Sequence, residues 1–166
     1  MNVNFKKHTD VLPGELTDIC TLKDMNWSYG YDRQKKWIGE NIDENDVHVL
    51  MYTDESLAGY CNLVWRSVSV AGRTLSVLGI GNVCVAPSYK NLKLGSALMA
   101  EVNKFLIDNH HHGILLCKDA LVGFYLKSQW ILIDRESVSA DYDLADINVM
   151  SFNFHVQDLY IHGKPF

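Results

Sequence analysis

A basic turn stands where an apolar strand meets an amphipathic helix, in the stretch VCVAPSYKNLKLGSALMAEVNKFL. The polar and small residues of this turn are Lys90, Asn91, Lys93, Gly95 and Ser96. The first turn of a helix has unpaired N–H groups and a partial positive charge, so it binds anions. A loop whose N–H groups point inward holds a diphosphate better than one side chain does. We expect this turn to bind a pyrophosphate, and the plain alternative is a solvated helix start.

The elements that must position this turn follow the order β-α-α-β-β-β-α-β-α-β-β, from the periods of the apolar residues. The expected strands are residues 2–9, 47–53, 57–70, 74–87, 113–118, 130–135 and 147–156. The expected helices are residues 13–26, 32–42, 92–109 and 119–128, the last with Asp119 as its N-cap. Residues 136–146 are expected to form a polar connection. Gly79 and Gly81 interrupt a strand, which marks a bulge or a place where something lies close to the backbone.

These elements predict a mixed α/β fold, with a mixed central sheet flanked by helices. No linker-like stretch appears, so we expect one domain spanning residues 1–166. No run approaches the length of a membrane span, and the N-terminal residues lack the apolar core of a signal peptide. We therefore expect a soluble cytoplasmic protein that does not bind membranes.

The net charge of −5 disfavours a nucleic-acid binder, which needs a basic face. An acidic field draws cationic substrates, although solubility alone also explains a slightly acidic chain. The four cysteines form no C-x-x-C pair and have no zinc spacing. The triple histidine His110–His112 could suggest a metal, but we expect it to close a helix before Gly113. No metal is therefore expected.

Two segments together resemble the GNAT superfamily of acyl-CoA-dependent N-acyltransferases. NVCVAPSYKNLKLGSAL is similar to the family's acetyl-CoA-binding segment, a strand followed by [RQ]-x-x-G-x-[GA] at the start of a helix. GFYLKSQW is similar to the family's F-Y-x-K-x-G-[FW]. The expected order of elements agrees with the family from Asn2 to about Phe154. The hairpin SVSVAGRTLSVLGIGNVCV and the final GKPF look, more loosely, like the aminoglycoside 2′-N-acetyltransferase branch.

The resemblance implies an N-acetyltransferase with a GNAT-like fold and acetyl-CoA as co-substrate. The implied cofactor-binding residues are Val83, Cys84, Val85, Lys90, Asn91, Leu92, Lys93, Leu94, Gly95, Ser96 and Asp119. Three positions depart from the family: Lys93 replaces its first glycine, Lys90 its Arg or Gln, and Gln129 the glycine before Trp130. We expect Lys93 to keep a helical φ and to bring its ammonium group near phosphate as a point charge.

Family members transfer the acyl group directly from the thioester to an amine. An amine with a pKa near 10.4 must first lose a proton. The resemblance implies an oxyanion donor among the N–H groups of Val83, Cys84 and Val85, and Tyr125 as the acid that protonates the departing thiolate. Many relatives have a glutamate near the strand bulge where this chain has Asn82, which can only position a water. The candidate bases are Asp32, Glu40, His155 and the carboxylate of Phe166.

The implied acceptor is a primary amine of a small molecule, aminoglycoside-like if the looser resemblance holds. In this fold the segment between the first two helices borders the acceptor groove. Its Trp27, Tyr29, Tyr31 and Asp32 combine aromatic rings with an acid and could bind a cation, although Trp27 could equally pack in the core. Phe166 is assigned to the acceptor site from the aminoglycoside branch alone. Cys84 could be read as a nucleophile, but direct transfer needs none.

Two other functions stay open. Lys93 and the missing glutamate favour a non-catalytic CoA-binding or regulatory module. A protein or peptide N-acetyltransferase would use the same cofactor site with a different acceptor. The sequence leaves a homodimer open as well.

Overall fold

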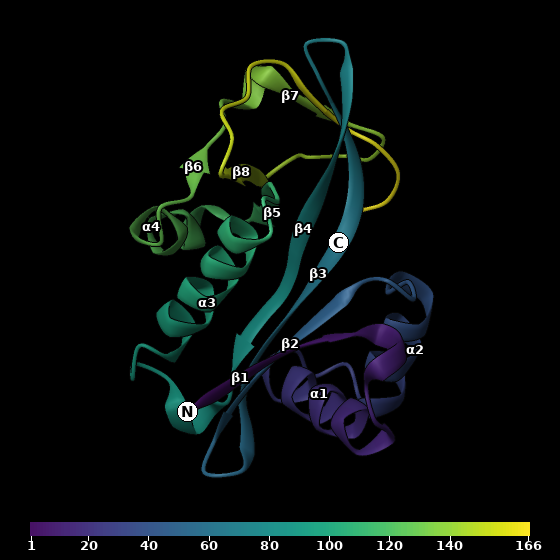
Figure 1. Cartoon of the computed structure of the whole chain (residues 1–166), viewed down its shortest axis with the longest axis vertical. Coiled ribbons are helices and arrows are strands. Elements are labelled where there is room, and N and C mark those ends of the chain that lie inside the picture. The colour runs from purple at the N-terminus through teal and green to yellow at the C-terminus, as the bar shows by residue number, and fades with distance from the viewer. The chain divides into compact units, whose positions relative to one another are not determined.

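The computed structural model describes residues 1–166, and its elements follow the predicted mixed α/β order with two additional short strands (Figure 1). The strands are β1 (Asn2–Lys7), β2 (Val47–Thr53), β3 (Ser56–Val70), β4 (Arg73–Val85), β5 (Gly113–Cys117), β6 (Ile131–Leu132), β7 (Val138–Ala140), β8 (Asn148–Phe152) and β9 (Leu159–Ile161). The helices are α1 (Pro13–Asn26), α2 (Tyr31–Asn41), α3 (Leu94–Asp108) and α4 (Asp119–Lys127). Three short 3₁₀ turns are η1 (His8–Asp10), η2 (Pro87–Tyr89) and η3 (Arg135–Ser137). The predicted fold class is confirmed.

The chain divides into two compact units, which are described in turn. The first unit contains residues 1–64 and 82–101, and the second contains residues 65–81 and 102–166. Strands β3 and β4 and helix α3 each contribute residues to both units. No helix of the chain combines the length and the apolar character that crossing a membrane requires.

In the first unit, β2 pairs antiparallel with both β1 and β3, with Val3 opposite Met51 and Val49 opposite Cys61. Helices α1 and α2 lie beside each other in this unit (Figure 1). Helix α1 begins at Pro13 as predicted, because proline suits the first helical position. Its first turn is closed by Glu15, whose carboxylate accepts from the Leu12 N–H at 2.9 Å. The buried residues of α1 are Ile19, Cys20, Leu22 and Lys23.

A buried histidine links three elements of the first unit. His48 on β2 is fully buried, and its Nε2 lies 2.9 Å from Nδ1 of His8 while its Nδ1 lies 2.8 Å from the Tyr60 hydroxyl. Burial, together with the smaller effects of His8 and Lys23, lowers the pKa of His48 from its ordinary 6.5 to about 4. The folded protein therefore binds this proton more weakly than the unfolded chain does.

This shift predicts an acid-sensitive fold. Because the pKa is lowered on folding, the stability from neutral His48 is complete above pH 6.5 and is lost as the pH falls toward 4. From pH 7 to pH 5 we expect the free energy of unfolding to drop by about 2 kcal/mol. Urea denaturation at both pH values will measure it. The His48→Gln variant, which cannot titrate, should lose most of this difference, and an unchanged difference would contradict the assignment.

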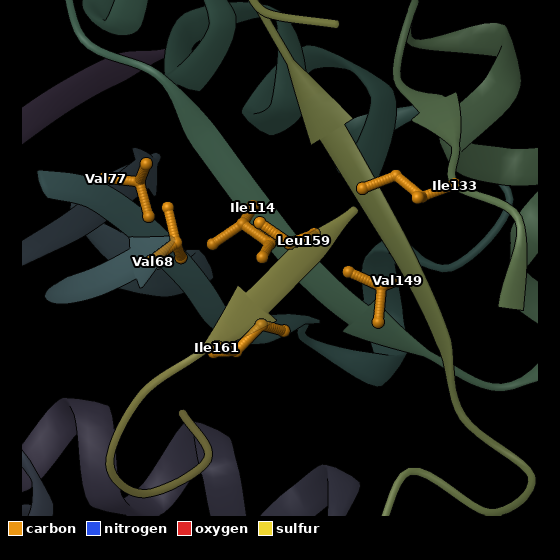
Figure 2. Close-up of a cluster of buried hydrophobic side chains, with 7 residues drawn as sticks. All are labelled: Val68, Val77, Ile114, Ile133, Val149, Leu159 and Ile161. Atoms are coloured by element: carbon orange, nitrogen blue, oxygen red, sulfur yellow. The ribbon is translucent and has the colours of Figure 1, made fainter. Parts of the chain in front are cut away.

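In the second unit, β5 pairs parallel with β4 and antiparallel with β8, and β6 pairs with the other edge of β8. Strand β9 pairs antiparallel with the end of β3 and parallel with β7. Apolar side chains from these strands meet in one buried cluster (Figure 2). Its members are Val68, Val77, Ile114, Ile133, Val149, Leu159 and Ile161. This cluster is the core that holds β8, β9 and β5 together.

Three expectations for the second unit are wrong. The polar connection predicted for residues 136–146 contains the end of η3 and all of β7. Strand β9 was not predicted either, because strands of three residues form through long-range pairing. The strand predicted for residues 130–135 is reduced to β6, since the chain leaves the sheet at η3. Asp119 is not an N-cap: Lys118 holds that position without a side-chain bond, and Asp119 is the first residue of α4.

The end of α3 follows the prediction in part. The helix ends at Asp108, and His110 adopts a left-handed φ of 55° while the His111 N–H donates to the Leu106 carbonyl. His110 therefore makes the turn that was expected of Gly113. Gly113 instead begins β5 under a large ring, since a Cβ there would lie 2.7 Å from Cη2 of Trp130.

Candidate active site

The connection between β4 and α3 has the backbone of an anion site. The first helical backbone hydrogen bond of this region runs from the Ala97 N–H to the Lys93 carbonyl, at 3.0 Å. The preceding N–H groups, those of Leu94, Gly95 and Ser96, belong to the first turn of α3 and are available to a ligand. The side chains of Lys90 and Lys93 are exposed beside them. Together these groups can hold a diphosphate in the way that the sequence predicts.

The backbone of this connection corrects one expectation. Lys93 does not have a helical φ; its φ is 60°, in the left-handed region, as is that of Asn91 at 67°. Glycine enters this region without steric cost, which explains why the family pattern has glycine where this chain has Lys93. Gln129, which replaces the family's glycine before Trp130, is also left-handed, with a φ of 67°. Both residues therefore adopt the left-handed backbone of a glycine, with the steric strain that a side chain brings there.

Strand β4 is distorted at Asn82. This residue has a φ of 53°, and its Nδ2 donates to Oδ1 of Asn62 at 2.6 Å. The Nδ2 of buried Asn62 has no partner within the protein. Farther along β4, the Val85 carbonyl accepts from Asn26 Nδ2 at 3.1 Å. A left-handed residue within a strand turns the following peptide groups out of the regular ladder.

The first unit contains a cavity of about 360 Å³ beside this distortion. Its lining residues are Lys23, Trp27, Tyr29, Arg33, Gln34, Trp37 and Asn82. Three of the residues singled out from the sequence, Trp27, Tyr29 and Asn82, thus meet in one cavity. Tyr31 and Asp32 are not among its lining residues; the Tyr31 hydroxyl lies 3.3 Å from that of Thr17, and Asp32 is exposed in the first turn of α2.

Lys23 also lines this cavity, although the sequence alone did not predict it as a site residue. Only 1% of it is exposed, and its Nζ lies 3.9 Å from the centroid of the Trp37 ring. Burial lowers the pKa of Lys23 from 10.5 to about 8, against a smaller opposite effect of the Cys84 and Cys20 thiols. The available signal was its position on the apolar face of α1, four residues after Ile19.

Cys84 cannot act as a nucleophile at neutral pH. It is buried, and burial raises the pKa of its thiol from 9.0 to about 12, with Lys23 acting in the opposite direction. Only a thiolate attacks carbonyl carbon effectively, so a thiol this hard to ionise is inert. All four cysteines of the chain are free and buried.

The second unit contains Tyr125, the predicted acid. It lies on α4, is 6% exposed, and packs against the Phe124 ring, with the ring centroids 4.9 Å apart and the planes at 70°. Asp119, at the start of the same helix, accepts from Asn148 Nδ2 at 2.6 Å and from Arg135 Nη2 at 3.1 Å. Its carboxylate therefore ties α4 to β8, and its cofactor contact stays a prediction.

Phe166 is held by the second unit. Arg66 donates from Nε to the Lys164 carbonyl at 3.1 Å and from Nη2 to the Pro165 carbonyl at 3.2 Å. The Phe166 ring lies directly over Gly79, where a Cβ would be 2.7 Å from its Cγ. This is the close approach that a glycine within β4 predicted, and the ring of Phe166 is what lies there. The role of the Phe166 carboxylate in acceptor binding stays a prediction.

Residues 15–130 match the sequence family described as acetyltransferase (GNAT) domain. The chain belongs to the GNAT acetyltransferase family. The family's members transfer acetyl groups from acetyl-CoA, so this GNAT protein is an N-acetyltransferase with acetyl-CoA as its co-substrate. The match includes the β4–α3 connection, the cavity residues and Tyr125. No curated protein sequence matches the chain.

Solved structures share the GNAT fold at low sequence identity. Escherichia coli YhbS, a GNAT family N-acetyltransferase solved in complex with CoA, has a TM-score of 0.69 at 14% identity, over 99% of this chain and 91% of YhbS. Escherichia coli ElaA has a TM-score of 0.68 at 15% identity, over 91% and 99%. An acyl-CoA N-acyltransferase from Pseudomonas aeruginosa has a TM-score of 0.66 at 17% identity, over 91% and 97%. These similarities confirm the predicted fold.

Proposed function

We propose that this GNAT enzyme acetylates the primary amine of a small molecule bound in the cavity beside Asn82. The observation that carries the proposal is the cavity itself, whose volume of about 360 Å³ lies in the range of small-ligand sites. Its aromatic walls can bury the body of a small acceptor. Asn82 places one end of the cavity at the distorted part of β4, where the resemblance assigns the oxyanion donors.

In the proposed reaction the neutral amine attacks the carbonyl carbon of the thioester. The carbon–nitrogen bond forms, the carbon–sulfur bond breaks, and the sulfur leaves as a thiolate. A backbone N–H among Val83, Cys84 and Val85 donates to the oxyanion, and the Tyr125 hydroxyl gives its proton to the thiolate. The amine proton leaves through a water held by Asn82 and Asn62. The buried Nδ2 of Asn62, which has no partner within the protein and lies on the residue bonded to Asn82, supports this role.

For the pyrophosphate we propose the N–H groups at the start of α3 together with Asn91, Leu92, Lys90 and Lys93. The lysines would act as point charges, because neither can make the two parallel bonds of an arginine. The final acceptor of the amine proton stays open among Asp32, Glu40, His155 and the Phe166 carboxylate. Glu40 lies 3.7 Å from Lys36 in an exposed ion pair.

We further propose a single cytoplasmic domain that acts on small molecules and binds neither nucleic acid nor membranes. Four free cysteines support a reducing compartment, and the net charge of −5 supports the absence of a nucleic-acid partner. A homodimer stays open.

Thiol release from acetyl-CoA, measured with a panel of small amines and a panel of peptides, tests the proposal. We expect turnover with small amines and little with peptides. Turnover with peptides alone would replace the small-molecule acceptor with a peptide acceptor. Binding of CoA in a calorimeter without turnover on either panel would favour the non-catalytic module, and no binding at all would remove the cofactor assignment.

A further inference from the structure

The ammonium group of Lys23 lacks a carboxylate partner inside the cavity. None of the ion pairs of the structure includes Lys23, and the only groups that favour its charged form electrostatically are the thiols of Cys84 and Cys20. Its one favourable contact is with the face of Trp37. A cation that is 99% buried is costly unless a counter-ion compensates it, and one cation–π contact compensates only part of that cost.

A second cation lines the same cavity. Arg33 is exposed and its guanidinium makes no ion pair or hydrogen bond within the protein. The seven lining residues include no aspartate or glutamate. A cavity with two cations and no acid repels a polycationic acceptor and attracts an anionic group.

We propose that the acceptor amine also carries a carboxylate, and that this carboxylate binds Lys23 within the cavity with Arg33 beside it. The proposal rests on the proposed function and names the substrate class: an amino acid or a similar amine with an apolar body. The carboxylate supplies the counter-ion that buried Lys23 lacks, and the planar fork of Arg33 suits a carboxylate as well. In this arrangement the apolar body of the acceptor contacts Trp27, and its amine points toward Asn82, which lines the same cavity as Lys23.

The sharpest test compares two ligands that differ only in the anion. N-acetylphenylalanine and its amide have the same body and no free amine, so their calorimetric dissociation constants report the carboxylate alone. We expect the acid to bind about 10- to 100-fold more tightly than the amide, the range of a hydrogen bond between charged groups. In Lys23→Met the two should bind within about threefold of each other. Methionine has a similar length and is apolar, so this variant should fold.

Two further variants complete the design. Lys35→Met removes an exposed lysine of α2 outside the cavity and should keep the wild-type preference, while Lys23→Arg should retain most of it. Equal binding of acid and amide by the wild type, or no binding of either, would overturn the proposal. A preference that survives in Lys23→Met would overturn it as well.

Activity separates this inference from the proposed function. With acetyl-CoA, phenylalanine should be acetylated with a higher kcat/KM than 2-phenylethylamine, and Lys23→Met should reverse or abolish that order. If Lys23→Met instead lowers the rate equally for both amines, Lys23 acts in proton transfer or folding and the anion role is overturned. Turnover without a carboxylate preference contradicts only this inference, whereas tight acid binding without turnover contradicts only the proposed function.

Discussion

Tyr125→Phe should lower the rate of acetyl transfer at saturating substrates by about 100-fold, the lower end of what a positioned general acid contributes. The phenyl ring keeps the packing of Tyr125 against Phe124, so the change removes only the hydroxyl. The affinity for CoA should stay within about twofold, because the lost proton matters only when the carbon–sulfur bond breaks. Steady-state thiol release gives the rate, and calorimetry gives the affinity.

Tyr142→Phe is a matched control for this experiment. The Tyr142 hydroxyl is buried without a hydrogen-bond partner, so its removal should cost neither stability nor activity. A normal rate in Tyr125→Phe would take Tyr125 out of the mechanism. An equal loss of rate in both variants would mean that the second unit tolerates no change in its tyrosines, whatever their role.

Trp130→Ala should lower the free energy of unfolding by about 3–5 kcal/mol, as for large aromatic residues in cores. Trp130 is 1% exposed, its Nε1 donates to Asn103 Oδ1 at 2.9 Å, and its ring lies 5.4 Å from that of Phe152. It also covers Gly113, which has no room for a side chain. Alanine would leave a cavity and an unpaired acceptor on Asn103. Urea denaturation at pH 7 will measure the loss.

Trp65→Ala provides the comparison. Because Trp65 is 37% exposed, this change should lower the free energy of unfolding clearly less than Trp130→Ala does. If both variants lose the same stability, burial at the end of the GFYLKSQW segment is not what makes Trp130 important. A loss in Trp130→Ala below about 1 kcal/mol would contradict the cavity argument. The variant should still bind acetyl-CoA where it remains folded.

Most of the fold could be predicted from local sequence, because the spacing of the apolar residues and the positions of prolines and glycines decide it. Pro13 marks the start of α1, and the apolar runs of β2 to β5 are long enough to be unambiguous. Strands β7 and β9 could not be predicted, since three residues carry too little pattern and their pairing is set by distant partners. The turn at Lys93 was predicted as a site, but its left-handed φ was not, because a lysine gives no sign of it.

The candidate site was predicted less completely than the fold. Trp27 and Asn82 were both singled out, yet only the folded chain places them in one cavity with Trp37. Lys23 was missed because a lysine within an apolar face usually reaches the solvent by extending along it. Here the neighbouring helix covers that route, and the Trp37 ring lies over the ammonium group.

The buried cysteines make the enzyme convenient to study. Each thiol has a raised pKa because it is buried, which slows its reaction with electrophiles. A chromogenic disulfide reagent added to a working reaction will therefore report the coenzyme's sulfhydryl with little background from the folded polypeptide. The same reagent would respond strongly once the chain unfolds, so a rising baseline doubles as a warning of denaturation.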